Sequence, residues 1–130
     1  KLSVFVPGEP RAMQTGSIIK LPNGRRFPKR RRTEWGDRIA LAAQQVAPAR
    51  LLEGPLRVHL VIQRLRPKSV SKKVLYPITR PDLDNYRKGL DCLQGIWFRD
   101  DAQIVICQEQ KVFTDQPGML IVVEEIHGTA

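Results

Sequence analysis

The chain has 130 residues and a mass of 14.8 kDa, which suits one domain and argues against a two-domain enzyme with its own cofactor fold. Its 22 Lys and Arg against 13 Asp and Glu leave a formal net charge of +9, which favours a polyanionic partner, above all nucleic acid. Hydrophobic residues make up 42%, enough for a packed core, but no run approaches the roughly 18 apolar residues of a membrane span, so a transmembrane protein is excluded.

The first residues show no basic stretch followed by a long apolar stretch, so we expect no signal peptide and a cytoplasmic location. The two cysteines, Cys92 and Cys107, are too few and too isolated for a zinc cluster or a disulfide framework. We interpret both as ordinary buried thiols, so neither is a candidate site residue.

The first quarter of the chain predicts a strand, a hairpin and a helix. Residues 2–6 alternate as a short strand that stops at the prolines of 7–10. Residues 16–27 form a small basic hairpin turned on Asn-Gly. A helix begins after Thr33, a suitable N-cap, and ends before Pro48. Its Trp35 falls at helical spacing with other apolar residues, which favours the core over base stacking.

The remainder of the chain predicts a strand over residues 55–65 with one solvent-exposed face, a long basic loop over 66–80 and a second helix over 84–94. The β-rich runs 102–113 and 119–126 are consistent with an antiparallel pair. We therefore expect an α+β fold: one domain over residues 1–130, with two helices packed on a small mixed sheet.

The charges are unevenly distributed. Acid-free stretches lie between Pro10 and Thr33 and between Gly54 and Pro81, and together they hold 15 of the 22 bases. The alternative is an ordinary solvent-exposed surface on which the basic residues cluster by chance. Surface charges normally mix signs, so phosphate binding is favoured. The predicted DNA contacts are Arg11, Lys20, Arg25, Arg26, Lys29, Arg30, Arg31, Arg32, Lys72, Lys73, Arg80 and Lys111.

An acidic cluster follows the second basic stretch. Asp82 and Asp84 point to one side of an extended segment, and oxygen ligands of this kind suit Mg²⁺ or Mn²⁺. Asp100 and Asp101 form a second pair, of which we expect Asp101 to join the site, with Asp100 accessory. The structural alternative is that Asp82, Asp84 and Asn85 cap the second helix. A second acidic pair in a strongly basic chain favours the metal site.

One polar stripe runs along the predicted second helix, where Asp84, Lys88 and Asp91 lie at i, i+4 and i+7. Lys88 either forms an ordinary salt bridge to Asp84 or reaches a scissile phosphate and stabilises its developing charge. We favour the phosphate role. No Gly-rich phosphate loop or Ser/His/Asp arrangement accompanies it.

Three stretches carry a family resemblance: the early Val6-Pro7-Gly8-Glu9-Pro10, the run Arg80-Pro81-Asp82-Leu83-Asp84-Asn85-Tyr86-Arg87-Lys88, and Trp97-Phe98-Arg99-Asp100-Asp101-Ala102-Gln103-Ile104. They resemble the RusA family of Holliday junction resolvases, and the similarity covers most of the chain. The D-x-D-N and D-D-A-Q patterns are the specific part of the resemblance. It implies a small homodimeric endonuclease, frequently encoded by phages and prophages, that uses magnesium or manganese to nick two opposed strands of a four-way DNA junction.

The same resemblance implies roles for individual residues. Asp82, Asp84 and Asp101 match the essential carboxylates, and Lys88 matches the lysine beside them. The spacing from Lys88 to Asp91 is one residue shorter than the usual pattern, which on an α-helix rotates Asp91 by about 100°. Asp91 is therefore an accessory candidate, and Asn85 of the D-x-D-N pattern is another. The early loop from Arg11 also lacks the denser bases common in the family.

The leading interpretation is thus a metal-dependent endonuclease that resolves four-way junctions in a bacterial or phage-infected cell and acts as a symmetric homodimer. Two alternatives remain open from the residues alone. One is a non-catalytic nucleic-acid-binding module whose acids are helix caps and salt-bridge partners. The other is a nuclease of RNA or of other branched DNA on the same scaffold.

Overall fold

The computed structural model of the chain describes residues 1–13, 18–20, 22, 26–28 and 33–127. Its helices and strands are β1 (Leu2–Pro7), β2 (Ile18–Lys20), β3 (Arg26–Pro28), α1 (Glu34–Gln45), β4 (Leu56–Leu65), α2 (Leu83–Arg87), the 3-10 helices η1 (Lys88–Leu93) and η2 (Asp101–Gln103), β5 (Ile104–Thr114) and β6 (Gly118–Glu125). No described helix is both long and apolar enough to cross a membrane.

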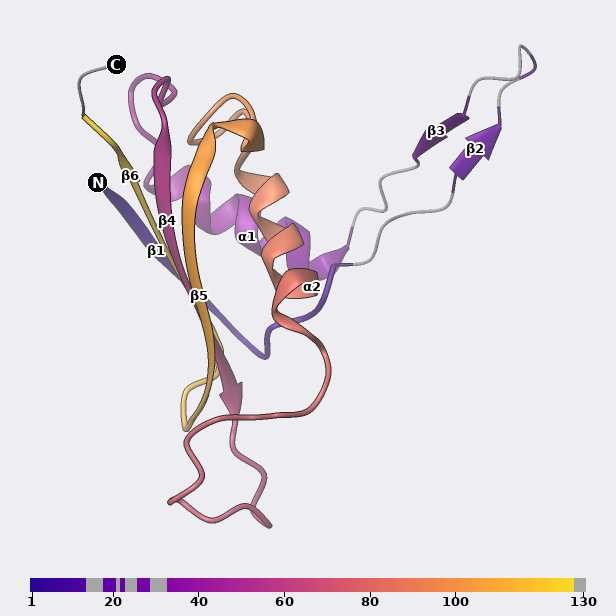
Figure 1. The fold of residues 1–130 in the computed structure, drawn as a ribbon, viewed down its shortest axis with the longest axis vertical. Coiled ribbons are helices and arrows are strands. Elements are labelled where there is room, and N and C mark those ends of the chain that lie inside the picture. Colours follow the sequence, from indigo (N-terminus) through magenta and orange to yellow (C-terminus); the bar gives the residue numbers. More distant parts are fainter. Residues whose placement is uncertain (14–17, 21, 23–25, 29–32, 128–130) are drawn as a thin grey trace.

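Four of the strands form one mixed sheet in the order β1-β6-β4-β5, while β2 and β3 pair antiparallel in a separate hairpin. Strand β4 runs parallel to β5 and antiparallel to β6. A parallel pair needs a long crossover, and here the chain from β4 to β5 carries α2 and η1. Helices α1 and α2 lie on the same side of the sheet (Figure 1). The predicted α+β fold with a mixed sheet and two helices is confirmed.

The predicted antiparallel pairing of the last two strands is wrong. Strand β4 lies between β5 and β6, so these two strands share no ladder. The three residues from Asp115 to Pro117 can span roughly 10–14 Å, enough to cross the end of one intervening strand. Strand β4 takes the central place because its inner side chains, Leu56 to Ile62 at alternate positions, are fully buried.

The second helix also differs from the prediction, because its α-helical part ends at Arg87 and η1 continues it as a 3-10 helix. Gly89 is the second residue of this continuation, and a glycine weakens an α-helix. A Cβ at that position would lie 3.0 Å from Ile39 Cδ1, so the glycine also lets η1 pack closely against α1. The predicted stop at Gly95 is confirmed by its positive φ of 83°.

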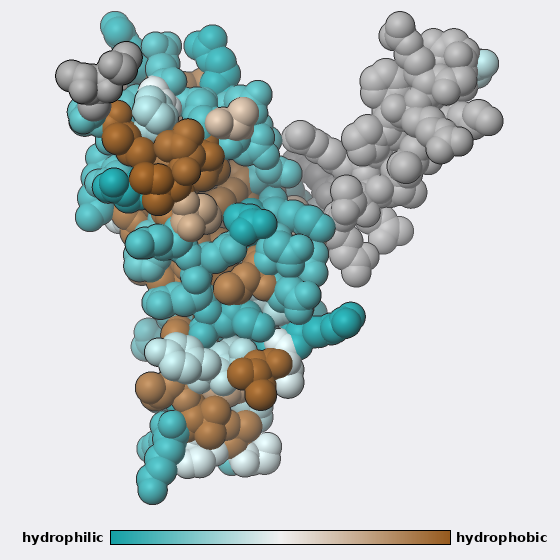
Figure 2. All heavy atoms as spheres, in the orientation of Figure 1, coloured by the Kyte–Doolittle hydropathy of each residue, from teal (hydrophilic) through white to brown (hydrophobic). Residues whose placement is uncertain are grey.

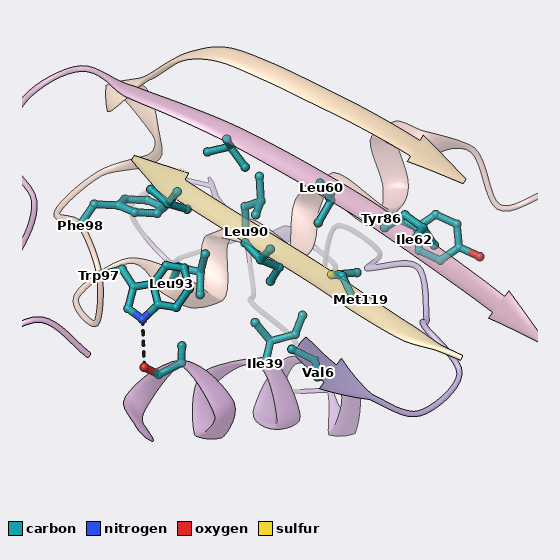
Figure 3. Packing of buried hydrophobic residues seen from close by; sticks show 14 of the residues in the cluster. Val6, Ile39, Leu60, Ile62, Tyr86, Leu90, Leu93, Trp97, Phe98 and Met119 are labelled. Carbon is teal, nitrogen blue, oxygen red and sulfur yellow. Dashed lines mark hydrogen bonds between the residues drawn. The ribbon is translucent and has the colours of Figure 1, made fainter. Parts of the chain in front are cut away.

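Helix α1 begins as predicted, because the Thr33 hydroxyl accepts a hydrogen bond from the Gly36 backbone N–H at 3.0 Å. Its inner face, with Trp35 and Ile39, joins the core (Figure 3). Trp35 is 4% exposed, which confirms that it packs in the core and is not presented for base stacking. The core joins one face of the sheet to α1 and η1.

The opposite face of the sheet is not covered by α1 or α2 (Figure 1). The register places Phe5, Val61, Ile106, Leu120 and Val122 on this outer face. Phe5 and Ile106 are each 40% exposed. The same register places the polar Arg57, His59 and Gln108 on this face, so it combines apolar with polar side chains.

Candidate active site

An open pocket of about 430 Å³ lies where the second helical segment faces the edge strand β5. Its lining residues are Asp84, Arg87, Lys88, Leu90, Asp91, Asp101, Ile104 and Cys107. The prediction that the motif acids meet at a mouth between the sheet edge and the second helix is therefore supported for Asp84 and Asp101. Three carboxylates and two cations gather at one opening.

Asp82 and Asp84 open helix α2, and the buried Tyr86 anchors this turn in the core. Asp82 occupies the N-cap position, but its side chain makes no capping hydrogen bond. Asp82 therefore has the position of a helix cap, as the capping alternative expects, but its carboxylate does not perform the capping hydrogen bond. Asp84 lines the pocket, whereas Asp82 is outside the lining residues.

The second acidic pair opens η2, with Asp100 as its N-cap and Asp101 as its first residue, and β5 follows at Ile104. Trp97 and Phe98, both 0% exposed, anchor the chain before this turn, and the Trp97 indole donates to the Ala43 carbonyl at 2.9 Å (Figure 3). Gln103 then fixes the turn: its Oε1 accepts from the backbone N–H groups of Arg99 and Asp100, at 2.9 and 3.0 Å.

The amide nitrogen of Gln103 donates to the carbonyls of Leu52 and Gly54, at 2.9 and 3.1 Å. The glutamine of the D-D-A-Q pattern is therefore a structural hub with four hydrogen bonds. This hub holds the acidic turn against the segment before β4. Sequence reasoning identified the motif but not this function of its last residue.

The two acids of the turn have different environments. Asp100 caps η2, since its Oδ1 accepts from the Ala102 N–H at 2.9 Å, and this bond lowers the pKa of Asp100. Asp101 lines the pocket, and its backbone N–H donates a hydrogen bond to Gln94 Oε1 at 3.1 Å. A hydrogen bond to the Asp91 carboxylate raises the pKa of Asp101, with smaller contributions from burial and from Asp100.

The 3-10 geometry of η1 places Asp91 differently from the prediction. In a 3-10 helix residues three apart are eclipsed, so Lys88 and Asp91 share one face. Both line the pocket, and Asp91 lies within hydrogen-bonding reach of Asp101. The expected rotation of about 100° assumed an α-helix and is wrong. The tighter helix compensates for the shorter spacing and brings Asp91 to the site.

Lys88 is held at the pocket by Asn85, because its ammonium donates to Asn85 Oδ1 at 3.1 Å. The salt bridges of the described residues include no pair between Lys88 and Asp84, so the simple i,i+4 alternative is not what the structure has. The Lys88 side chain is part-buried and lines the same pocket as Asp84, Asp91 and Asp101.

Two pocket residues were missed by sequence reasoning. Arg87 is held by Glu109 of β5, with 2.6 Å between Arg87 Nη1 and Glu109 Oε1. Cys107 is half-buried, not fully buried as expected, and burial raises the pKa of its thiol. No local pattern marks these contacts, because they join a helix to a strand about twenty residues later.

The predicted DNA contacts are only partly within the described residues. Arg11, Lys72, Lys73 and Arg80 are exposed. Lys111 Nζ instead donates to the carbonyls of Thr79 and Pro81, at 3.0 and 3.1 Å. Lys20 and Arg26 lie in the hairpin strands β2 and β3. The predicted contacts Arg25, Lys29, Arg30, Arg31 and Arg32 lie outside the described residues.

The crowding of carboxylates predicts a stability effect. The raised pKa of Asp101 means that the folded state binds its proton more tightly than the unfolded chain, so stability falls as pH rises through that pKa. At pH 7 without divalent cations, Asp101→Asn removes the repulsion and raises Tm by about 1–3 °C in a thermal melt. Asp115→Asn, at an exposed position between β5 and β6, is the control and leaves Tm unchanged. A lower Tm for Asp101→Asn would contradict this electrostatic description.

Comparison with known proteins bears directly on this pocket. The family model described as Endodeoxyribonuclease RusA matches residues 7–124, nearly the whole chain. The chain belongs to the RusA family of endodeoxyribonucleases. The match includes β4 to β6, α2 and both acidic pairs, so the resemblance seen in the sequence is confirmed.

A curated relative extends the comparison. The chain is 33% identical over 99 residues to Uncharacterized protein YqaN of Bacillus subtilis (strain 168), which covers 68% of this chain and 70% of the relative. As a RusA-family chain, the protein is a DNA-acting hydrolase, and the pocket on β5 is its candidate active site.

Proposed function

We propose that the protein is a divalent-metal-dependent endonuclease that resolves four-way DNA junctions by paired, symmetric nicks. The observation that carries this proposal is the meeting of Asp84, Asp91, Asp101 and Lys88 at one pocket of a RusA-family chain. Basic side chains on the loop before Asp82 supply the charge that attracts a DNA backbone.

The donor set of the pocket fits a hard divalent cation. Among the described residues, no group of three or more His, Cys, Asp or Glu side chains lies close enough together to hold a metal ion by itself. Mg²⁺ keeps several waters and is usually bound through one or two carboxylates together with substrate phosphates. Asp84, Asp91 and Asp101, which line the same opening, form such an open donor set. We assign Mg²⁺ or Mn²⁺ to these carboxylates. Asp82 lies outside the pocket lining, and its role as a further ligand is proposed from the family resemblance.

The chain's own residues divide the work at a scissile phosphate. When bound, the cation supplies Lewis-acid stabilisation of phosphate charge and activation of water. Asp84, Asp91 and Asp101 would hold that cation at the pocket. Lys88, oriented by Asn85, provides a fixed positive charge where negative charge develops on the phosphate oxygens. Arg87, oriented by Glu109, supplies further guanidinium N–H donors at the same opening.

The test of this function is a cleavage assay on three substrates of matched sequence: a synthetic four-way junction, a linear duplex and single-stranded DNA. Each is incubated with Mg²⁺ or with a chelator. We expect symmetric, Mg²⁺-dependent nicks confined to the junction. Salt-sensitive binding without any metal-dependent product would identify a non-catalytic binding module. Equal cleavage of flaps or RNA would identify a nuclease of different specificity.

Paired nicking of a two-fold substrate is served most simply by a symmetric homodimer, and we propose that the outer sheet face is its interface. This face carries Val61, Ile106, Leu120 and their apolar neighbours, and neither α1 nor α2 covers it. It lies opposite the helices, so pairing through it leaves both pockets accessible to DNA.

A charge placed on the outer face should separate the subunits. Ile106→Asp changes a residue that is 40% exposed, so the subunit itself stays folded. We expect light scattering to show a dimer for the parent and a monomer for Ile106→Asp, with junction cleavage reduced to single nicks. Leu41→Asp, at a 61% exposed position on α1, is the matched control and remains dimeric. A parent that is monomeric at working concentration would contradict the dimer.

A further inference from the structure

The loop between β4 and α2 exposes a group of large apolar side chains. Val74, Leu75 and Tyr76 are 44%, 57% and 59% exposed. Ile78, at 95%, is the most exposed large hydrophobic residue of the described chain. Figure 2 shows this apolar surface over the loop at the lower end of the molecule, separate from the apolar surface of the sheet. The catalytic roles proposed above use none of these side chains.

The segment that presents Ile78 is held firmly on the sheet. Pro77 is buried, and the Phe113 N–H donates to the Leu75 carbonyl at 2.9 Å. On the other side of Ile78, Lys111 Nζ donates to the Thr79 carbonyl at 3.0 Å, and Arg64 Nη1 donates to the Thr79 hydroxyl at 3.2 Å. Buried and hydrogen-bonded neighbours thus flank an apolar side chain that contacts almost nothing itself.

The surroundings of Ile78 indicate the chemistry of its partner. Lys72, Lys73 and Arg80 are exposed on the same loop, and the range 66–81 contains no acid. Ile78 precedes Asp82 by four residues, which an extended chain spans in roughly 14 Å. An apolar tip surrounded by cations, close in sequence to the acids of the proposed metal site, suits unstacked DNA nucleobases whose phosphates contact the neighbouring Lys and Arg side chains.

We propose that Ile78, supported by Tyr76, inserts against unstacked bases at the branch point of the DNA junction and so determines selectivity for branched over continuous duplex DNA. This inference rests on the proposed junction-resolving function. Apolar side chains inserted between base steps unstack them, and an aromatic ring offers a face on which a displaced base stacks. A continuous duplex resists this insertion, whereas a branch point has already lost part of its stacking.

The test compares Ile78→Ser with the parent and with Ile78→Leu, which keeps an apolar tip. A four-way junction labelled with 2-aminopurine at the branch point reports unstacking through a rise in fluorescence, measured in chelator. Cleavage with Mg²⁺ is then followed on this fully paired junction and on a second junction with mismatched, unpaired branch-point bases. Leu41→Ser, which removes a similarly exposed apolar group from α1, is the control, and thermal melts verify folding.

We expect parent, Ile78→Leu and Leu41→Ser to give the fluorescence rise, and Ile78→Ser to lose most of it. Ile78→Ser should cleave the paired junction roughly tenfold more slowly or worse, and recover the parent rate on the unpaired junction. Parent-like fluorescence and cleavage by Ile78→Ser would overturn the inference. So would an equal loss on both junctions, or a change of oligomeric mass that assigns Ile78 to a protein contact.

Failure of the underlying function gives a different pattern. If the parent cleaved no DNA, the junction-resolving function would be refuted. The fluorescence measurement in chelator would still show whether Ile78 unstacks the branch point. The two conclusions therefore fail separately.

Discussion

Asp84→Asn is expected to lower Mg²⁺-dependent nicking of a four-way junction by roughly 10³-fold or more while leaving junction binding intact or stronger. Asp84 lines the pocket with Asp91 and Asp101, so the amide removes a ligand charge from the centre of the site. The same change reduces repulsion between the protein and DNA phosphates, which is why binding is preserved. Single-turnover cleavage and a gel-shift titration in chelator measure the two effects separately.

Asp115→Asn is the matched control for this prediction. It removes an identical charge from an exposed position between β5 and β6, away from the pocket, and should leave both cleavage and binding at parent values. Asp101→Asn should behave as Asp84→Asn does, because Asp101 lines the same opening from η2. Parent-like nicking by either site variant would mean that the carboxylates have been assigned wrongly.

Lys88→Ala is expected to lower the maximal cleavage rate by about 10²–10³-fold, with a much smaller change in junction affinity. The ammonium is already oriented at the pocket by Asn85, so it is placed to act in the transition state more than in ground-state binding. Asn85→Ala keeps the charge but removes its partner and should cause a smaller loss in the same rate.

Lys68→Ala provides the comparison for Lys88, since it removes the same charge from an exposed loop position. Loss of a contact that only binds phosphate weakens affinity and its salt dependence but leaves the rate of the bound complex unchanged. If Lys88→Ala altered only the affinity, as expected for Lys68→Ala, then Lys88 would be a DNA contact and not a catalytic residue.

Local patterns were sufficient to predict much of the fold. Thr33 as N-cap, the alternation along β4 and the stop at Gly95 depend on neighbours in sequence, and all three are confirmed. The resemblance placed Asp84 and Asp101 together, and the structure has both at one pocket. These features follow from propensity, periodicity and motif spacing, which one sequence displays directly.

Features that depend on tertiary packing were not predictable. The insertion of β4 between β5 and β6 reflects competition among strands for the buried centre of the sheet. Gly89 of η1 packs closely against Ile39 of α1, and the 3-10 geometry of η1 places Asp91 on the same face as Lys88 at the pocket. The Arg87–Glu109 pair likewise joins elements that no motif connects.

The central claim is that Asp84, Asp91 and Asp101 share one divalent cation beside Lys88. Anomalous diffraction from crystals grown with Mn²⁺ tests it most directly, because Mn²⁺ substitutes for Mg²⁺ at oxygen sites and is located without reference to activity. We predict an anomalous peak in the pocket on β5, at coordination distance from at least two of these carboxylates, and its loss in Asp84→Asn. An empty pocket in crystals whose Mn²⁺ binds elsewhere on the chain would contradict the claim.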